Sequence, residues 1–183
     1  MAPLPPFATA DDLNERVSWD LSDMERAQAS RLLADASNLI RAAAGYQQIS
    51  RVDDDVVTLR GSGTGRLRLP QRPVRDVTAV AGLGGTEWAW DGGVSLDRLP
   101  WGLWLGPVTV TYSHGLDGGD IGFQVAVSVA CDAVKRCLIN PEMLRQRSID
   151  DYAETLADAR ASLLDGEADT IRTAFAGPQW GIS

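Results

Sequence analysis

The segment Ser22–Gly45, SDMERAQASRLLADASNLIRAAAG, decides how the rest of the sequence is divided. It opens with the spacing of a capping box, because Glu25 follows Ser22 by three residues. The apolar residues that follow recur at helical intervals and form one stripe: Leu32, Leu33, Ala36, Leu39, Ile40 and Ala43. Gly45 is placed to end the helix in the left-handed conformation. The segment therefore predicts a helix from about Ser22 to Ala44. Its charged residues are expected mostly on other faces: Arg26, Arg31, Asp35 and Arg41.

Further helices are predicted on both sides of this segment. Thr9 is placed to cap a short helix that carries Leu13 and Val17 on one face. Beyond the middle of the chain, Ile121–Ile139 is almost free of charge and apolar on nearly every side, which is typical of a helix buried all round. Asn140-Pro141 ends that helix. A weaker amphipathic pattern follows at Tyr152, Leu156, Ala159 and Leu163, and Ala168–Ala176 is predicted as a last short helix.

The stretch from Tyr46 to Gly115 shows strand and turn signals instead. Val56–Leu59 and Arg66–Leu69 flank the glycine-rich turn Gly61–Gly65, which predicts a hairpin. Three further strands are predicted at Val74–Ala81, Glu87–Trp90 and Val108–Tyr112, with an irregular stretch at Gly92–Pro107. Short strands so close in sequence favour a small antiparallel sheet.

These patterns predict an α+β fold that is predominantly α-helical, with the small antiparallel sheet inserted between the second and third helices. The predicted domain spans residues 1–165, its β-rich insertion spans about 46–115, and residues 166–183 form a C-terminal arm.

The composition argues against direct binding to nucleic acid or membranes. The chain has 183 residues and a formal net charge of −8, whereas a protein that grips phosphates needs a basic face. No apolar run approaches the roughly 20 residues that cross a bilayer, and the N-terminus does not have the pattern of a secretory signal. We expect a protein made in the cytosol.

Residues that carry chemistry are scarce, and we expect no enzyme activity, no cofactor and no metal. The single histidine, His114, lies in a turn, and no second histidine exists to share a metal, so a zinc site would need carboxylates or the two cysteines. Cys131 and Cys137 face different sides of one helix and are expected to be buried thiols. The run Asp53–Asp55 lacks the glycine and glutamate of a calcium loop. Gly61–Gly65 and Gly82–Gly85 lead into strands, whereas a phosphate loop leads into a helix.

Six tryptophans are many for a chain of this length. Trp88, Trp90, Trp101 and Trp104 crowd the β segment, whose short strands are not expected to bury all of them. We predict that these four contribute mainly to a subunit interface, with packing in the protomer's own core and ligand stacking as the alternatives.

Several local sequences, taken in order, resemble the head-to-tail connector proteins (adaptor, or head-completion proteins) of long-tailed phages. The resemblance lies in Phe7–Leu13, in Leu21–Arg41, in Leu69–Val74, in Pro107–Gly115 before a helix that ends at Asn140-Pro141, and in Ser148–Tyr152. It covers about Phe7–Tyr152, and Glu154–Ser183 departs from the family's ending.

The resemblance implies a virion structural protein at the head–tail interface. Such an adaptor forms a ring, dodecameric in the virion, beneath the portal protein, where it extends the DNA channel and binds the next neck, stopper or tail-completion protein. DNA passes through the lumen without sequence-specific binding. Self-association and portal contacts are then expected to involve the four tryptophans above together with Tyr152, Ile171, Phe175 and Trp180.

Three other functions stay open at this stage. A carbohydrate- or ligand-binding module would use the tryptophan cluster as a stacking platform. A small hydrolase would use His114 with a nearby acid. A helix-turn-helix DNA binder built from the first two helices is disfavoured by the negative charge.

Overall fold

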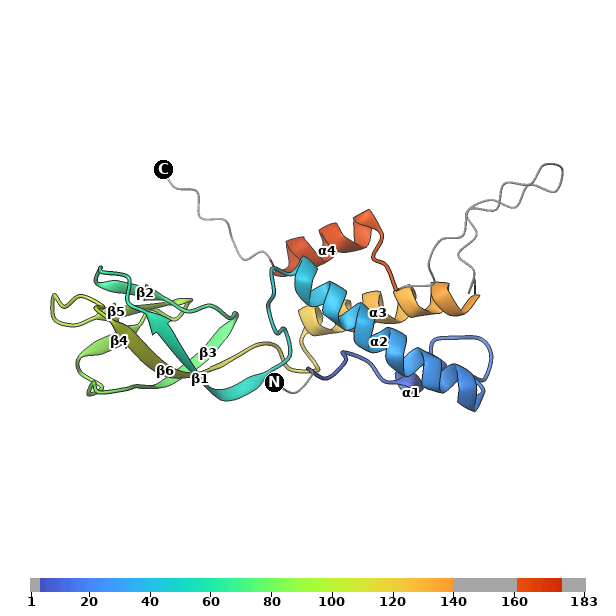
Figure 1. The fold of residues 1–183 in the computed structure, drawn as a ribbon, viewed down its shortest axis with the longest axis horizontal. Coiled ribbons are helices and arrows are strands. Elements are labelled where there is room, and N and C mark those ends of the chain that lie inside the picture. Colours follow the sequence, from blue (N-terminus) through green and yellow to red (C-terminus); the bar gives the residue numbers. More distant parts are fainter. Residues whose placement is uncertain (1–3, 140–160, 176–183) are drawn as a thin grey trace. The chain divides into compact units, whose positions relative to one another are not determined.

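The computed structural model describes residues 4–139 and 161–175 (Figure 1). The chain divides into two compact units. The helical unit comprises the chain up to Tyr46 and from Ile121 onward, and the β unit comprises Gln47–Asp120. The sequence predicts the insertion at about 46–115, and the β unit lies between the second and third helices as expected.

The helical unit contains α1 (Ala10–Asn14), α2 (Asp23–Ala43), α3 (Ile121–Ile139) and α4 (Asp165–Phe175). Helix α2 packs against the other three helices, and α3 also contacts α1 and α4 (Figure 1). Thr9 and Ser22 both form complete capping boxes, with Asp12 and Glu25 as their partners, which confirms the predicted helix starts. Gly45 has a φ of 76° directly after the C-cap Ala44, as its position predicts.

The stripe on α2 is buried largely as predicted, although Ala43 is only partly buried and two other residues also differ. The buried apolar residues are Ala29, Leu32, Leu33, Ala36 and Ile40. Leu39 is 39% exposed and lies outside the stripe, whereas Arg41 is only 6% exposed. The Arg41 guanidinium lies 4.3 Å from the centre of the Phe7 ring and donates to the carbonyl of Pro5. Arg41 therefore holds the N-terminal segment against α2. The sequence had predicted Arg41 on a face away from the buried stripe.

Helix α3 is buried along its middle rather than all round. Its buried residues are Ala126, Val127, Val129, Ala130, Cys131, Ala133, Val134 and Cys137. At its two ends Ile121 and Ile139 are 85% and 62% exposed. Both cysteines are buried and unbridged, as expected, and burial raises the pKa of the Cys131 thiol to about 11. None of the described helices is both long enough and apolar enough to cross a lipid bilayer.

The β unit contains two antiparallel three-stranded sheets. One has the order β1 (Val52–Arg60), β6 (Pro107–His114) and β3 (Val74–Val80). The other has the order β2 (Arg66–Arg68), β5 (Ser95–Arg98) and β4 (Trp88–Trp90). Strand β6 is the centre of the first sheet, where Val110 lies opposite Val57 of β1 and Val80 of β3.

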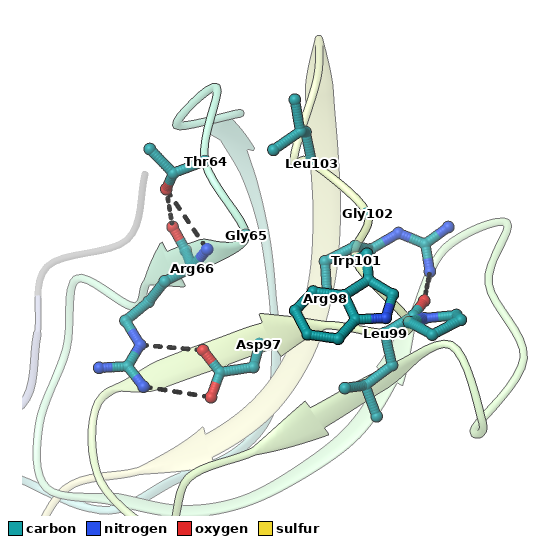
Figure 2. Close-up of a pocket in the computed structure, with 10 residues that line it drawn as sticks. Thr64, Gly65, Arg66, Asp97, Arg98, Leu99, Trp101, Gly102 and Leu103 are labelled. Atoms are coloured by element: carbon teal, nitrogen blue, oxygen red, sulfur yellow. Dashed lines mark hydrogen bonds and ion pairs between the residues drawn. The ribbon is translucent and has the colours of Figure 1, made fainter.

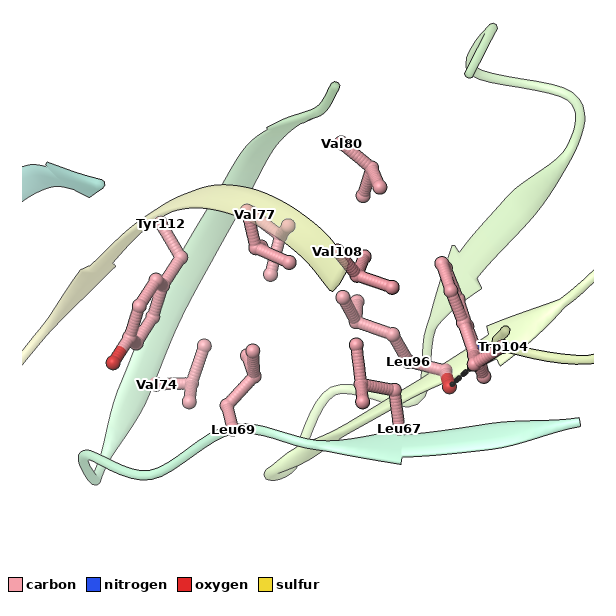
Figure 3. Packing of buried hydrophobic residues seen from close by; sticks show 10 residues of the cluster. Leu67, Leu69, Val74, Val77, Val80, Leu96, Trp104, Val108 and Tyr112 are labelled. Atoms are coloured by element: carbon pink, nitrogen blue, oxygen red, sulfur yellow. Dashed lines mark hydrogen bonds between the residues drawn. The ribbon is translucent and has the colours of Figure 1, made fainter. Parts of the chain in front are cut away.

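Side chains from both sheets form the core of the β unit (Figure 3). The buried cluster consists of Leu67, Leu69, Val74, Val77, Val80, Leu96, Trp104, Val108, Val110 and Tyr112. On β6 these residues alternate with partly exposed ones, which is the period of two expected for a strand with one buried face. Leu96 of β5 and Val110 of β6 are fully buried, so both sheets contribute to one core.

The predicted predominantly helical fold is wrong. About 37% of the described residues are helical and about 24% lie in strands, and the strands form two sheets instead of one small sheet. The predicted hairpin is also wrong, because β1 pairs with β6 and β2 pairs with β5. The Gly61–Gly65 segment carries the chain from one sheet to the other. Strand β5 lies within the stretch Gly92–Pro107 that the sequence predicted as irregular.

Helix α4 begins at Asp165, three residues before the predicted Ala168, and includes Gly166. Arg136 of α3 pairs with Glu167 of α4 through two hydrogen bonds of 2.6 and 2.8 Å. Burial raises the pKa of the Glu167 carboxyl, but the Arg136 guanidinium and the Leu164 N–H outweigh it and leave that pKa below its ordinary value. The predicted amphipathic helix from Tyr152 lies mostly outside the described residues.

A Ser37→Ala substitution tests how the N-terminal segment is held. The buried Ser37 Oγ accepts from the Phe7 N–H at 3.0 Å and donates to the Leu33 carbonyl at 2.6 Å. Removing it leaves a buried N–H without a partner, so the free energy of unfolding should fall by about 1–3 kcal/mol. The matched control is Ser30→Ala, whose hydroxyl bonds the Arg26 carbonyl on the exposed side of α2. Equal unfolding free energies for the two variants in urea would contradict the assignment.

The Arg136–Glu167 pair predicts a pH dependence. Because the pKa of Glu167 is lowered on folding, its contribution to stability is present above the ordinary glutamate pKa and is lost as the pH falls through the lowered value. Wild type should therefore lose more stability than Glu167→Gln between neutral and acidic pH, as measured by urea unfolding at a series of pH values. Parallel pH profiles for the two proteins would show that the pair does not stabilise α4.

Candidate protein-interaction surface

The loop Leu99–Leu105, hereafter the apolar loop, connects β5 to β6 and exposes large hydrophobic side chains. Trp101 is 99% exposed, and three leucines of the loop are also exposed: Leu99 at 40%, Leu103 at 55% and Leu105 at 71%. Isolated exposed leucines are ordinary, but this short loop exposes four large apolar side chains, and three of them, Leu99, Trp101 and Leu103, line one pocket, which is typical of protein–protein contacts. The apolar loop is therefore the candidate functional site.

Trp104 anchors the apolar loop in the core of the β unit. Its side chain is 2% exposed, and its indole N–H lies 3.1 Å from the Gly65 carbonyl and 3.2 Å from the Leu96 carbonyl. The polar atom of the buried indole is thus satisfied. The loop backbone is fixed as well, because the Trp104 N–H donates to the Thr64 carbonyl and the Gly63 N–H donates to the Trp104 carbonyl.

The glycine-rich segment Gly61–Gly65 is what allows this close approach. A Cβ atom on Gly61 would lie 2.4 Å from the Trp104 carbonyl oxygen, a distance that side chains do not tolerate. The Gly61 N–H donates to the carbonyl of Gly106, the residue that follows the apolar loop. Gly61 therefore allows the backbone of this segment to pack directly on the backbone of the apolar loop.

Arg98 holds the other end of the apolar loop. Its guanidinium donates to the carbonyls of Glu87 and Leu99 and lies 3.3 Å from the Glu87 carboxylate. The Gly84 N–H and the Arg98 guanidinium together lower the pKa of Glu87. Gly102 packs against Arg98, since a Cβ there would lie 2.6 Å from Arg98 Cγ. Trp101 has a φ of 62°, which is uncommon for a bulky residue. The apolar loop is thus held in one conformation that points Trp101 outward.

A shallow groove of about 740 Å³ adjoins the apolar loop (Figure 2). Residues Leu99–Leu103 of the loop line it together with Thr64–Arg66 and Asp97–Arg98. Arg66 and Asp97 form an ion pair at its edge, with Nε 2.9 Å from the carboxylate (Figure 2). Apolar side chains bordered by paired charges reproduce the pattern of a protein interface, which has an apolar centre and a polar rim.

The four tryptophans do not form one exposed cluster. Trp88 and Trp90 of β4 are half-buried against the core of the β unit, and the Trp90 indole N–H donates to the Gly93 carbonyl. Trp104 is buried and only Trp101 is fully exposed. The predicted stacking platform built from all four indoles is therefore not present, and Trp101 alone offers a whole indole face to a ligand. The interface role of the four residues stays a prediction, and Trp101 is the one that offers its whole side chain.

The other predicted interface residues lie at the C-terminal end of the chain. Ile171 and Phe175 of α4 are 0% and 7% exposed, because α4 packs on α2 and α3. Their side chains serve the core of the helical unit, and a partner contact through them stays a prediction. Tyr152 and Trp180 lie outside the described residues.

The residues considered for chemistry mostly have structural partners, although the buried His114 Nδ1 has none among the described residues. His114 is fully buried on β6, where its Nε2 lies 3.2 Å from Asp55 Oδ2 and its ring packs 5.0 Å from that of Tyr112. Asp53 pairs with Arg51 at 2.8 Å, so the acidic run is divided between two partners. Across residues 4–139 and 161–175 no three His, Cys, Asp or Glu side chains are grouped to hold a metal ion.

Sequence reasoning singled out Trp101 but missed Leu99, Leu103 and Leu105. The signal that could have found them is the composition of the segment itself, because Pro100, Gly102 and Gly106 interrupt the apolar run. Such interruptions prevent a strand or helix from burying it, so its large side chains are left at the surface.

No protein-family model matches the sequence, and no curated protein is significantly similar to it. Among solved structures, the chain is similar to one in the "Neck of empty GTA particle computed with C6 symmetry", with a TM-score of 0.51 and 16% identity over 94% of this chain and 92% of that chain. It also matches a chain in the "Virion of native gene transfer agent (GTA) particle", with a TM-score of 0.49 and 17% identity over 86% and 91% of the two chains. The first similarity shows a shared fold.

A Gly61→Ala substitution tests the backbone contact beneath the apolar loop. The new methyl group forces the Trp104 carbonyl to move, so the free energy of unfolding should fall by about 1–3 kcal/mol. Gly85→Ala is the matched control, because a Cβ there meets open space and the change should stay within about 0.5 kcal/mol. Chemical denaturation of the full chain measures both. If Gly61→Ala is as stable as Gly85→Ala, the apolar loop is not held by this contact.

Proposed function

We propose that this chain is a virion structural protein of a phage-like particle, a head-to-tail adaptor without catalytic activity. It forms a ring beneath the portal protein, extends the DNA channel and presents a surface to the next neck or tail protein. The ring is dodecameric in the virion. No cofactor takes part in this role.

The fold is the first support for this proposal. The chain shares its fold with a chain in the neck of a GTA particle, and the similarity covers nearly the whole of both chains. Because one fold hosts many functions, the step from fold to neck protein is an analogy. The ordered sequence resemblance to phage connector proteins over about Phe7–Tyr152 supports the same role.

The observation that carries the proposal is the exposed and rigidly held apolar loop. Trp101 is held outward by the contacts of Trp104 and Arg98 on either side of it. A contact residue that is already ordered loses little conformational entropy on binding, so its apolar surface contributes more to affinity. We assign the apolar loop to contacts with a second copy of this chain. A contact between two different surfaces of identical chains closes into a ring when the rotation permits.

The charge of the chain supports the proposed passage of DNA through the ring. With a net charge of −8 the chain repels the phosphate backbone, and among the described strands and helices no basic cluster is longer than Arg66-Leu67-Arg68. A duplex that moves through such a lumen is not retained by counterion release.

A Trp101→Ala substitution tests the assignment of the apolar loop. Since Trp101 is 99% exposed, the free energy of unfolding should be unchanged. Loss of a central tryptophan from an interface costs about 2 kcal/mol or more, so each subunit contact should weaken at least about thirtyfold. Native mass spectrometry of the full chain, alone and with the cognate portal ring, should show rings for wild type and far fewer for the variant.

Val56→Ala is the matched control, because Val56 is a 63% exposed apolar residue of the same unit outside the apolar loop. It should assemble like wild type. Rings formed by Trp101→Ala at wild-type concentrations would remove the apolar loop from the subunit interface. Wild type that forms no ring and binds no portal at any concentration would overturn the proposed function itself.

A further inference from the structure

A second, smaller pocket of about 280 Å³ lies in the β unit, away from the apolar loop. It is lined by Gln47, Arg68, Leu69, Pro70, Arg72 and Val94. The side chains of Arg68 and Arg72 are its two charged groups, and both carry the same sign. Leu69 and Val94 add apolar surface beside them.

The two arginines of this pocket differ from most other arginines of the β unit. Ion pairs with carboxylates are formed by Arg51, Arg66, Arg75 and Arg98. Within the described part of the chain, neither Arg68 nor Arg72 has a carboxylate at ion-pair distance. The chain has 25 acidic and 17 basic residues, so carboxylates outnumber the basic side chains that could pair with them. The lack of ion pairs at Arg68 and Arg72 is therefore not caused by a shortage of carboxylates.

Arg72 carries a second sign of a missing partner. Its Nε atom is buried and has no hydrogen-bond partner among the described residues. A buried N–H of a charged group that bonds to nothing costs more free energy than a neutral one, and such groups in native proteins are normally paired. The guanidinium therefore has a free hydrogen-bond donor for which the described residues supply no acceptor.

Gln47 fixes the loop that carries Arg72. Its side chain is 7% exposed, accepts from the Arg72 N–H at 2.9 Å and donates to the Pro70 carbonyl at 3.2 Å. The Gln48 N–H also donates to the Gln71 side chain at 2.8 Å. These bonds hold the segment Pro70–Arg72 as one wall of the pocket, so the position of the Arg72 backbone does not depend on the ligand.

We propose that this pocket binds a carboxylate side chain of an acidic peptide segment of another protein molecule. A guanidinium presents its N–H groups as a planar fork that matches a carboxylate, and two such groups can hold one acidic side chain or two neighbouring ones. Leu69 and Val94 then accept an adjacent apolar side chain. This site is independent of the apolar loop and of the ring proposed above.

A nucleic acid is the less favourable occupant. The remaining surface of an acidic chain repels a phosphate backbone, and two phosphate contacts release too few counterions to overcome this repulsion. A short acidic peptide can place its carboxylates against Arg68 and Arg72 without extending over the rest of the acidic surface.

The test titrates the full chain with the peptide acetyl-Leu-Asp-Glu-Leu-amide and observes arginine Nε–H resonances by NMR. The Arg72 resonance should shift with a Kd on the order of 1 mM, and the peptide with Asn-Gln in place of Asp-Glu should cause no shift. Arg68→Gln and Arg72→Gln should each weaken binding about tenfold, as expected for loss of charge-assisted hydrogen bonds.

Arg60→Gln is the matched control, because Arg60 is an exposed arginine of β1 without an ion pair among the described residues and does not line the pocket. It removes the same charge and should leave binding unchanged. Equal losses for Arg60→Gln and Arg68→Gln would show a general charge effect and overturn the proposal. So would the absence of any shift, or stronger binding of inorganic phosphate or oligothymidylate than of the acidic peptide. Arg68 is exposed, so its variant tests the site even if Arg72→Gln does not fold.

Discussion

The indole of Trp104 is buried where the two sheets of the β unit meet, and its burial requires several conditions at once. Its N–H needs acceptors, which the Gly65 and Leu96 carbonyls supply. Its own carbonyl has to pass within a distance of Gly61 that excludes a side chain. Once these conditions are met, the chain on either side of Trp104 has little freedom. Trp101 is 99% exposed beside the buried Trp104, and its φ of 62° belongs to the loop conformation that the contacts of Trp104 and Arg98 maintain.

The helices could be predicted because their signals are local. A capping box spans four residues, and an apolar stripe repeats within one segment, so Ser22 and the buried face of α2 were readable from sequence. Strand pairing is not local. Val56–Leu59 and Arg66–Leu69 are separated by a turn that fits a hairpin, yet β1 reaches its partner β6 across more than forty intervening residues. The alternation that would favour either pairing is the same, and the choice depends on which core the strands bury.

The candidate surface was predictable as a region and not as a residue. The number of tryptophans indicated that some would be exposed, but Trp101 and Trp104 occur in the same apolar run with similar neighbours. Trp104 is the one that enters the core, where the Gly65 and Leu96 carbonyls accept its indole N–H. These two hydrogen bonds exist only in the folded chain. The pocket at Arg68 and Arg72 had no sequence signal at all. The sequence does not distinguish arginines that form ion pairs from those that do not, because this depends on where the carboxylates lie in the folded chain.

An exposed apolar segment can cause an unassembled subunit to aggregate. The risk is greatest when the segment is an edge strand, because its free N–H and C=O groups can pair with a strand of another molecule. Here the exposed leucines and Trp101 lie on a loop and not on a strand. Pro100 has no N–H to donate, and Gly102 and Gly106 occupy conformations or contacts that a regular strand does not use. The patch therefore has little capacity for edge-to-edge pairing of strands. Its apolar area becomes useful only to a partner whose shape fits the conformation that Trp104 and Arg98 maintain, which favours specific assembly over aggregation.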